Sequence, residues 1–320
     1  MLSVKEMKIL NVIANDARIS KIALARRVGI SRELTEYHLK KLKERKIILG
    51  SQARINLNAF SIGQYNLFLK VSDFGIEKDL VGMLKKLKYT HFVARIGGDF
   101  DYVVGFSIKK RGDLQDYLDS VYEEFGEKIL GHDVLTVTSE IKNDFSGLFG
   151  KESSGAKSSM VDIEGDVKLS EQDKIILKAL SKDAGVSAVD LAGKCGMSAA
   201  GIVHRIKRLE KESVLLGYIS EFDFTVLKKE FYYVYFSLKN PNKESVNKLK
   251  RAMLRSENVV FANQGVGGNS FLCLFFADSN KDLYEKILKF RRGVSEIGRQ
   301  SVYLVLDFLY QAHLPEGFLD

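Results

Sequence analysis

The chain has 320 residues, of which 45% are hydrophobic and 28% charged, and this predicts a globular protein of two or more domains. No apolar run reaches the length that a bilayer requires, and no signal peptide opens the chain, so we expect a cytoplasmic protein with no membrane partner. The two cysteines, Cys195 and Cys273, lie in apolar surroundings and are expected to be free thiols.

The net charge of +8 is concentrated at the front of the chain. Met1 to Ile55 hold seven Lys and six Arg against five acidic residues, an excess equal to that of the whole chain. Such a local field attracts phosphate backbones and predicts salt-sensitive binding to nucleic acid. A solubilising surface is the alternative explanation.

The segment Ile19 to Leu49 has the pattern of a helix-turn-helix. Ser20 is a suitable N-cap for a short helix, Gly29 allows a tight turn, and Ser31 caps a second helix. The expected inward positions are Ile22, Leu24, Ala25 and Val28 in the first helix, and Thr35, Leu39 and Leu42 in the second. A short cationic helix behind such a turn is typical of a recognition helix in the DNA major groove.

An internal repeat strengthens this interpretation. Shifted by 167 residues, the sequence matches itself without gaps, so that Gly29 falls on Gly196, Ser31 on Ser198 and Leu42 on Leu209. The alternative to a helix-turn-helix is an ordinary helical hairpin with a solvated surface. Such a hairpin would give no reason for the turn glycine, the serine caps and the core positions to occur again in the second copy. Because a β-rich segment follows each copy, we predict two winged helix-turn-helix modules.

Behind each module the pattern changes to strand, helix, strand, strand, helix, strand. The first copy's elements are expected at 64–71, 77–87, 91–96, 102–107, 114–125 and 133–140, and the second copy's at 231–238, 244–254, 259–264, 271–277, 282–290 and 300–310. This order predicts a ferredoxin-like βαββαβ domain, an antiparallel sheet with two helices on one face. Apolar residues on both strand faces predict sheet-to-sheet pairing over the other face.

The predicted fold class is therefore α+β, with two winged helix-turn-helix domains alternating with two ferredoxin-like βαββαβ domains. The expected division is 1–55, first winged helix-turn-helix; 56–150, first regulatory domain; 151–167, linker; 168–222, second winged helix-turn-helix; and 223–320, second regulatory domain. The linker is assigned from its Ser- and Gly-rich composition.

This combination resembles the Lrp/AsnC (feast/famine) family of transcription regulators, here as two complete copies in tandem. The resemblance is most specific in the second helix-turn-helix, Leu169 to Ile219, where Arg205 occupies the family's usual Arg position. His38 stands at that position in the first copy. The resemblance implies a DNA-binding regulator whose ferredoxin-like domains, of the amino-acid-metabolism regulatory (RAM) type, sense an amino acid and pair sheet to sheet.

The duplication suggests that this pairing forms within one chain. We therefore expect an intrachain pseudo-dimer with its two winged modules near opposite ends. Higher homo-oligomers remain open through other faces.

The expected contacts to double-stranded DNA lie mainly in the first module. They are Lys21, Ser31, Arg32, Glu33, Glu36, Tyr37, Lys40 and Lys41. Small apolar residues replace most of the outward side chains on the second recognition helix, which leaves Arg205, Lys207 and Arg208 as phosphate contacts. The first module should carry most of the affinity, and the second is expected to be weak rather than inert.

A candidate effector site lies in a loop of the first regulatory domain, at Gly97, Gly98, Asp99 and Asp101. Backbone N–H groups there would bind an amino acid's carboxylate, and the acids would accept from its ammonium. A polar β-turn is the alternative reading. Because Asn269, Ser270 and Phe271 of the second copy remove both negative charges, we expect at most one such site per chain.

An enzyme of the same architecture is the alternative function. Some fused proteins of this form resemble siroheme decarboxylases, which use a His-rich loop between central strands of the regulatory domain. Here that loop contains no His, and His91 stands alone at the start of a strand. No nucleophile elbow, Walker loop or Cys/His metal spacing is present. We therefore predict no enzymatic activity, no cofactor and no metal. A third alternative, an interaction module that has lost DNA binding, conflicts with the basic first module.

Overall fold

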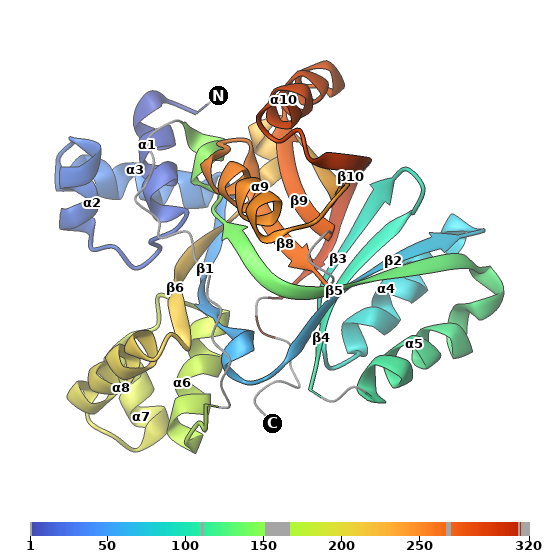
Figure 1. The fold of residues 1–320 in the computed structure, drawn as a ribbon. Helices are drawn as coiled ribbons and strands as arrows, with labels where there is room; N and C mark the ends of the chain where they lie inside the picture. Colours follow the sequence, from blue (N-terminus) through green and yellow to red (C-terminus); the bar gives the residue numbers. More distant parts are fainter. Residues whose placement is uncertain (1, 110–111, 151–166, 267–269, 313, 315–320) are drawn as a thin grey trace.

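The computed structural model describes residues 2–109, 112–150, 167–266, 270–312 and 314, and Figure 1 shows their arrangement. The first copy comprises α1 (Val4–Ile13), α2 (Lys21–Val28), α3 (Arg32–Glu44), β1 (Ile48–Ile55), β2 (Gly63–Val71), α4 (Glu77–Lys86), β3 (Thr90–Gly97), β4 (Tyr102–Ile108), α5 (Gly112–Phe125) and β5 (Ile129–Asn143). The second comprises α6 (Glu171–Lys182), α7 (Ala188–Cys195), α8 (Ala199–Lys211), β6 (Leu215–Phe222), β7 (Glu230–Leu238), α9 (Lys243–Arg255), β8 (Val259–Gly265), β9 (Ser270–Ala277), α10 (Asn280–Gly293) and β10 (Ile297–Gln311).

Short 3-10 turns connect several of these elements: η1 (Leu57–Ala59), η2 (Phe74–Ile76), η3 (Gly126–Lys128), η4 (Ser146–Phe149) and η5 (Phe224–Leu227). The predicted linker lies outside the described residues except for Val167. Within the part of the chain that the structure describes, no helix is long and apolar enough to span a membrane.

The predicted caps set the helix boundaries in the winged modules. The hydroxyl oxygens of Ser20 and Ser31 each accept a first-turn backbone N–H at 3.2 Å. Gly29 ends α2 with a φ of +76°, a left-handed conformation that favours glycine. One inward position was predicted wrongly: Ile22 is 66% exposed, because the apolar face of α2 is narrower and buries only Leu24, Ala25 and Val28.

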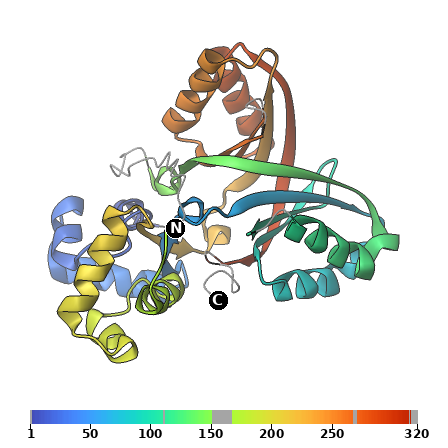
Figure 2. The same ribbon diagram turned by 60° about the horizontal axis from the view of Figure 1, so that its bottom comes forward.

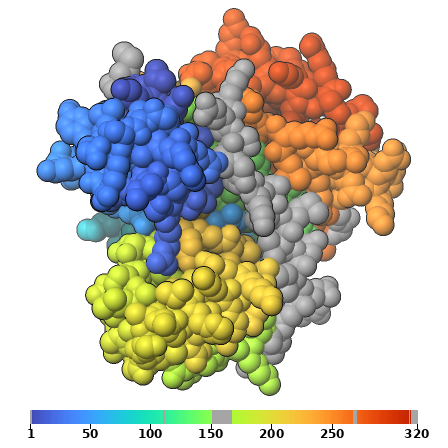
Figure 3. Space-filling model, turned by 90° about the vertical axis from the view of Figure 1, so that its left-hand side faces the viewer, coloured from blue at the N-terminus to red at the C-terminus, as the bar shows by residue number. Residues whose placement is uncertain are grey.

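The two winged modules lie side by side and share a two-stranded sheet. β1 of the first module pairs antiparallel with β6 of the second. Each strand contributes to both cores: Ile48 packs in the first and Ala53 in the second, while Leu215 packs in the second and Phe222 in the first. Figures 2 and 3 show the modules against each other on one side of the molecule. The prediction that they lie near opposite ends is wrong, because the shared strands hold them together.

The two regulatory sheets join into one closed barrel. Their strand orders are β3-β4-β2-β5 and β8-β9-β7-β10, as expected for two βαββαβ units. β5 pairs with β8 and β10 pairs with β3, which closes eight strands into a ring. β5 and β10, with 15 residues each, are longer than predicted, because each pairs first within its own sheet and then with the other copy. Pairing of the two regulatory sheets within one chain is confirmed. The pairing is made by hydrogen bonds between the edge strands of the two sheets.

Helices cover the outside of the barrel, and aromatic side chains fill much of its inside. α4 and α5 pack on the first sheet, and α9 and α10 pack on the second (Figure 2). Inside, Phe68 and Phe100 of the first copy meet Tyr303 of the second, with ring centres 5.7 to 6.2 Å apart. This shared apolar interior fixes the two copies relative to each other.

A half-buried acid in the shared β1–β6 sheet gives a testable stability prediction. Burial raises the pKa of Glu221, and a hydrogen bond from the Gln52 amide offsets part of that effect. An acid whose folded pKa is raised weakens folding once the pH is high enough to ionise it. Glu221→Gln should therefore raise the unfolding temperature at pH 7, and the gain should disappear below about pH 4, where the carboxyl is neutral in both states. Thermal melts across this range provide the measurement; a destabilised variant at pH 7 would contradict the prediction.

Candidate nucleic-acid interface and central cavity

The outer surface of α3 is polar and mostly cationic. Thr35 and Leu42 are buried on its inner side, and Leu39 is partly buried. The exposed side chains of this helix include Arg32, Glu33, Tyr37, Lys40, Lys41 and Lys43. The sequence-predicted contacts of the first module therefore share one accessible surface.

Local contacts organise that surface. Glu36 accepts from Arg32 Nε at 3.1 Å and lies 3.3 Å from Lys21 Nζ, which ties the start of α2 to α3. Lys41 Nζ lies 4.7 Å from the centre of the Tyr37 ring, within cation–π distance. The Ser31 hydroxyl caps α3. Since these exposed ion pairs are weak, the cations can turn to phosphates at little cost.

On α8, two of the three predicted phosphate contacts are engaged in their own module. Arg205 and Arg208 place guanidinium nitrogens 3.0 and 2.6 Å from the carboxylate of Asp173, which is 1% exposed. Burial alone would raise the pKa of Asp173, but hydrogen bonds from Ser170 and both arginines outweigh it and lower that pKa. These arginines support the fold of the second module, and Lys207 is exposed. Phosphate contacts at Arg205, Lys207 and Arg208 stay a prediction.

The first module has a weaker form of this cluster. Glu6 is 5% exposed and lies 2.9 Å from Arg45, while His38 Nδ1 is 3.9 Å away. His38 thus occupies the position that Arg205 holds in the second module. The presence of His instead of Arg at this position therefore changes the contacts that hold α3 in its module, and not the outer surface of α3.

The predicted effector loop does not bring its two acids into one open site. Asp101 is 5% exposed and accepts from Val71 N–H at 2.9 Å and from Lys70 Nζ at 3.1 Å. Asp99 is exposed. Gly98 has a φ of +143°, and a Cβ there would come within 3.0 Å of the Tyr303 ring. Asp101 therefore holds the turn against β2. The corresponding residue of the second copy, Asn269, lies outside the described residues.

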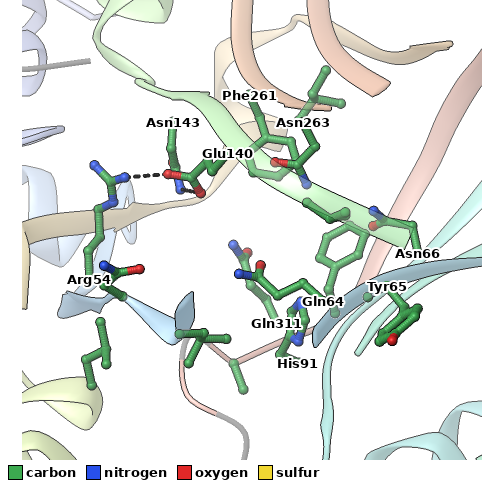
Figure 4. Close-up of a pocket in the computed structure, with 18 of the residues that line it drawn as sticks. Arg54, Gln64, Tyr65, Asn66, His91, Glu140, Asn143, Phe261, Asn263 and Gln311 are labelled. Atoms are coloured by element: carbon green, nitrogen blue, oxygen red, sulfur yellow. Dashed lines mark hydrogen bonds and ion pairs between the residues drawn. The ribbon is translucent and has the colours of Figure 1, made fainter. Parts of the chain in front are cut away.

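A cavity of about 200 Å³, here called the central cavity, lies where the barrel meets the β1–β6 sheet. All eight barrel strands line it, together with β1, η1, β6 and η5 (Figure 4). Arg54 and Glu140 form an ion pair of 2.6 Å in its wall, and Asn143 donates to the same carboxylate at 3.1 Å. Sequence reasoning singled out only His91 among its residues. The available signal was the pair Gln64 and Asn66, two polar residues on one face of a mostly apolar strand.

Comparisons with known proteins place these features among transcription regulators. A winged helix-turn-helix DNA-binding family model matches residues 2–48 and 169–215. The transcriptional regulatory protein DoeX of Halomonas elongata is 30% identical over 142 residues, which cover 43% of this chain and 89% of DoeX. An uncharacterized HTH-type transcriptional regulator of Pyrococcus furiosus is 34% identical over 93 residues, covering 28% of this chain and only 59% of that relative.

A full-length structural match corrects the prediction about enzymatic activity. The siroheme decarboxylase NirDL superposes with a TM-score of 0.65 over 98% of this chain and 96% of its own, at 13% identity. Its complex with an iron-uroporphyrin III analogue gives a TM-score of 0.64. The likeness is one of fold, and this duplicated architecture occurs in an enzyme. The prediction of no enzymatic activity, which relied on the absence of a His-rich loop and of catalytic motifs, is therefore wrong.

Proposed function

Because the chain belongs to the Lrp/AsnC family of transcription regulators, we propose that it binds duplex DNA sequence-specifically, mainly through its first winged module. The observation that carries the proposal is the contrast between two equivalent helices. α3 exposes Arg32, Lys40 and Lys41 together with Tyr37, whereas α8 exposes Val203 and His204 with Lys207. Arginine, lysine and tyrosine can contact phosphates and base edges, and an alanine- and glycine-rich surface offers few hydrogen bonds.

The arrangement of the modules supports simultaneous contact with one duplex. Both recognition helices belong to modules joined by the β1–β6 sheet, on the same side of the barrel (Figure 1). A single chain thus presents two linked helix-turn-helix units, as dimeric regulators do with two subunits. We also propose that the chain divides into a first winged module (1–55), a first regulatory domain (56–150), a linker (151–167), a second winged module (168–222) and a second regulatory domain (223–320). An amino-acid site at Gly97, Gly98 and Asp99 also remains a proposal, with Asp99 as its accessible acid.

The proposal predicts a steep salt dependence of DNA affinity. Fluorescence anisotropy with a labelled duplex, titrated between 50 and 200 mM salt, would measure it. If the chain neutralises about six phosphates, affinity should fall about 10³-fold over that range. An affinity that does not change with salt would contradict an interface made by the cations of α3.

Siroheme decarboxylation is a second candidate, favoured by the full-length fold match to NirDL and by His91 in the wall of the central cavity. The cavity volume of about 200 Å³ is small for a tetrapyrrole, since drug-sized ligands already occupy about 300–1,000 Å³. Absorbance spectra of the chain mixed with siroheme test this candidate directly. A shifted Soret band with turnover would support it.

A further inference from the structure

The central cavity contains a buried polar atom that the fold leaves without a partner. Asn263 on β8 is 4% exposed, and its Oδ1 has no hydrogen-bond partner among the described residues. Leaving a buried carbonyl oxygen unpaired costs about 1–3 kcal/mol, so such an atom in a cavity wall indicates a missing donor. Because Oδ1 itself has almost no accessible surface, a bound molecule with an N–H group would supply that donor once the Asn263 carboxamide turns its oxygen toward the cavity.

Other carboxamides line the same space. Figure 4 shows Gln64 and Gln311 near His91 toward the middle of the cavity, with Asn66 and Asn263 also in its wall. A carboxamide presents one donor and one acceptor in a plane, and therefore pairs with an adjacent acceptor and donor on a heteroaromatic ring. Asn and Gln use this geometry when they read adenine.

The charges of the wall cancel, which restricts the charge of a ligand. Arg54 and Glu140 are paired at 2.6 Å, with side chains 12% and 27% exposed, and Asn143 adds a hydrogen bond to Glu140. A buried charge on a ligand would need a free opposite charge, because an unpaired buried charge is costly. The cavity therefore favours an uncharged molecule over an amino-acid zwitterion.

Aromatic side chains supply stacking surfaces beside these polar groups. Phe92, Phe261 and Phe308 line the cavity, and Tyr233 lines it from the opposite copy to Phe92. Flat π-systems stack on such rings. The volume of about 200 Å³ suits one or two fused rings. We propose that the central cavity binds a free purine or pyrimidine base and that its occupancy regulates DNA binding.

The walls connect the proposed ligand to both DNA-binding modules. Arg54 and Ile55 belong to β1, and Leu216 belongs to β6, so the shared sheet of the winged modules forms part of the site. The remaining walls belong to the barrel. A base that contacts both sides would favour one placement of the sheet on the barrel, and hence of α3 and α8. This regulatory part rests on the proposed function, whereas base binding does not.

Calorimetric titration of the full chain, without DNA, tests the ligand class. Adenine, hypoxanthine, guanine and uracil are the probes, and leucine is the contrasting amino acid. We expect at least one base to bind with one site per chain, and leucine not to compete for it. Failure of all four bases to bind, or displacement of a base by leucine, would overturn the assignment.

Two variants and a matched control locate the site. Asn263→Leu should weaken base binding at least tenfold without lowering the unfolding temperature, because it removes an unpaired buried oxygen. Gln311→Leu should also weaken binding. Gln115→Leu, the same exchange at an exposed position on α5 outside the cavity, should leave affinity unchanged. Full affinity in Asn263→Leu and Gln311→Leu would place the base elsewhere.

Regulation is tested by measuring DNA affinity with and without the base that binds. A saturating base should change DNA affinity about fivefold or more, and DNA should change the base affinity by the same factor. The change should be absent in Asn263→Leu at the same base concentration. If a base binds but DNA affinity stays the same, the regulatory part is refuted. If the wild-type chain binds a base but does not bind DNA at all, only the proposed function is refuted.

Discussion

Replacing Arg32, Lys40 and Lys41 by alanine is expected to weaken DNA binding roughly a hundredfold. Three charge-assisted contacts at about 1 kcal/mol each amount to about 3 kcal/mol, and each 1.4 kcal/mol is tenfold. The slope of log affinity against log salt should also become shallower by nearly 3, because three fewer phosphates are neutralised. Anisotropy titrations of the triple variant and the wild type would measure both quantities. The replaced side chains are exposed, so the fold should survive.

The repeat offers a matched control at equivalent positions. Lys40 on α3 and Lys207 on α8 are 167 residues apart, and both are exposed. Lys40→Ala should reduce DNA affinity several-fold more than Lys207→Ala. Equal losses from the two substitutions would contradict the asymmetry between the modules.

Replacing both Arg205 and Arg208 by methionine should destabilise the second winged module by about 3–5 kcal/mol. The double change leaves the Asp173 carboxylate buried at 1% exposure without its two cationic partners. Chemical denaturation followed by circular dichroism would measure the loss.

Two further variants separate this effect from a general effect of lost charge. Adding Asp173→Asn to the double variant should restore most of the stability, because the unpaired charge is gone. Lys207→Ala, on the same helix, should change stability by no more than about 0.5 kcal/mol. Because the pKa of Asp173 is lowered, its stabilisation should be present above about pH 4 and lost as the pH falls further. An unchanged denaturation midpoint in the double variant would show that the cluster is not structural.

The sequence was sufficient for the local structure of each copy. Ser20, Gly29 and Ser31 act through residues within four positions of themselves, so cap and turn chemistry predicts them directly. The gapless repeat extended that inference to the second copy. Ile22 was misplaced because periodicity gives the centre of an apolar face better than its edge.

The joining of the two copies could not be predicted in the same way. β5 pairs with β2 at one end and with β8 at the other, and nothing in its alternation distinguishes the two partners. The placement of the winged modules depends on the β1–β6 pairing, which joins residues about 170 positions apart. The central cavity combines side chains from Arg54 to Gln311, so no spacing in the sequence reveals it.

The structure also shows contacts of charged residues that the sequence could not indicate. Arg205 and Arg208 have the helical spacing of phosphate contacts, but their guanidinium groups bind an acid at the start of α6. Asp101 has the composition of a ligand loop, but Val71 and Lys70 take up its carboxylate. In each case the deciding partner is distant in sequence, and only the fold brings the pair together.

Selection of binding sites from random duplex DNA by the purified chain tests the central claim most directly. We predict one enriched motif whose sequence information is concentrated in the half read by α3, with a weaker second half beside it. The Arg32, Lys40 and Lys41 triple variant should lose that enrichment, and the Lys207→Ala variant should keep it. A motif with two equally informative halves, or no enrichment by the wild-type chain, would contradict a regulator that reads DNA mainly through its first module.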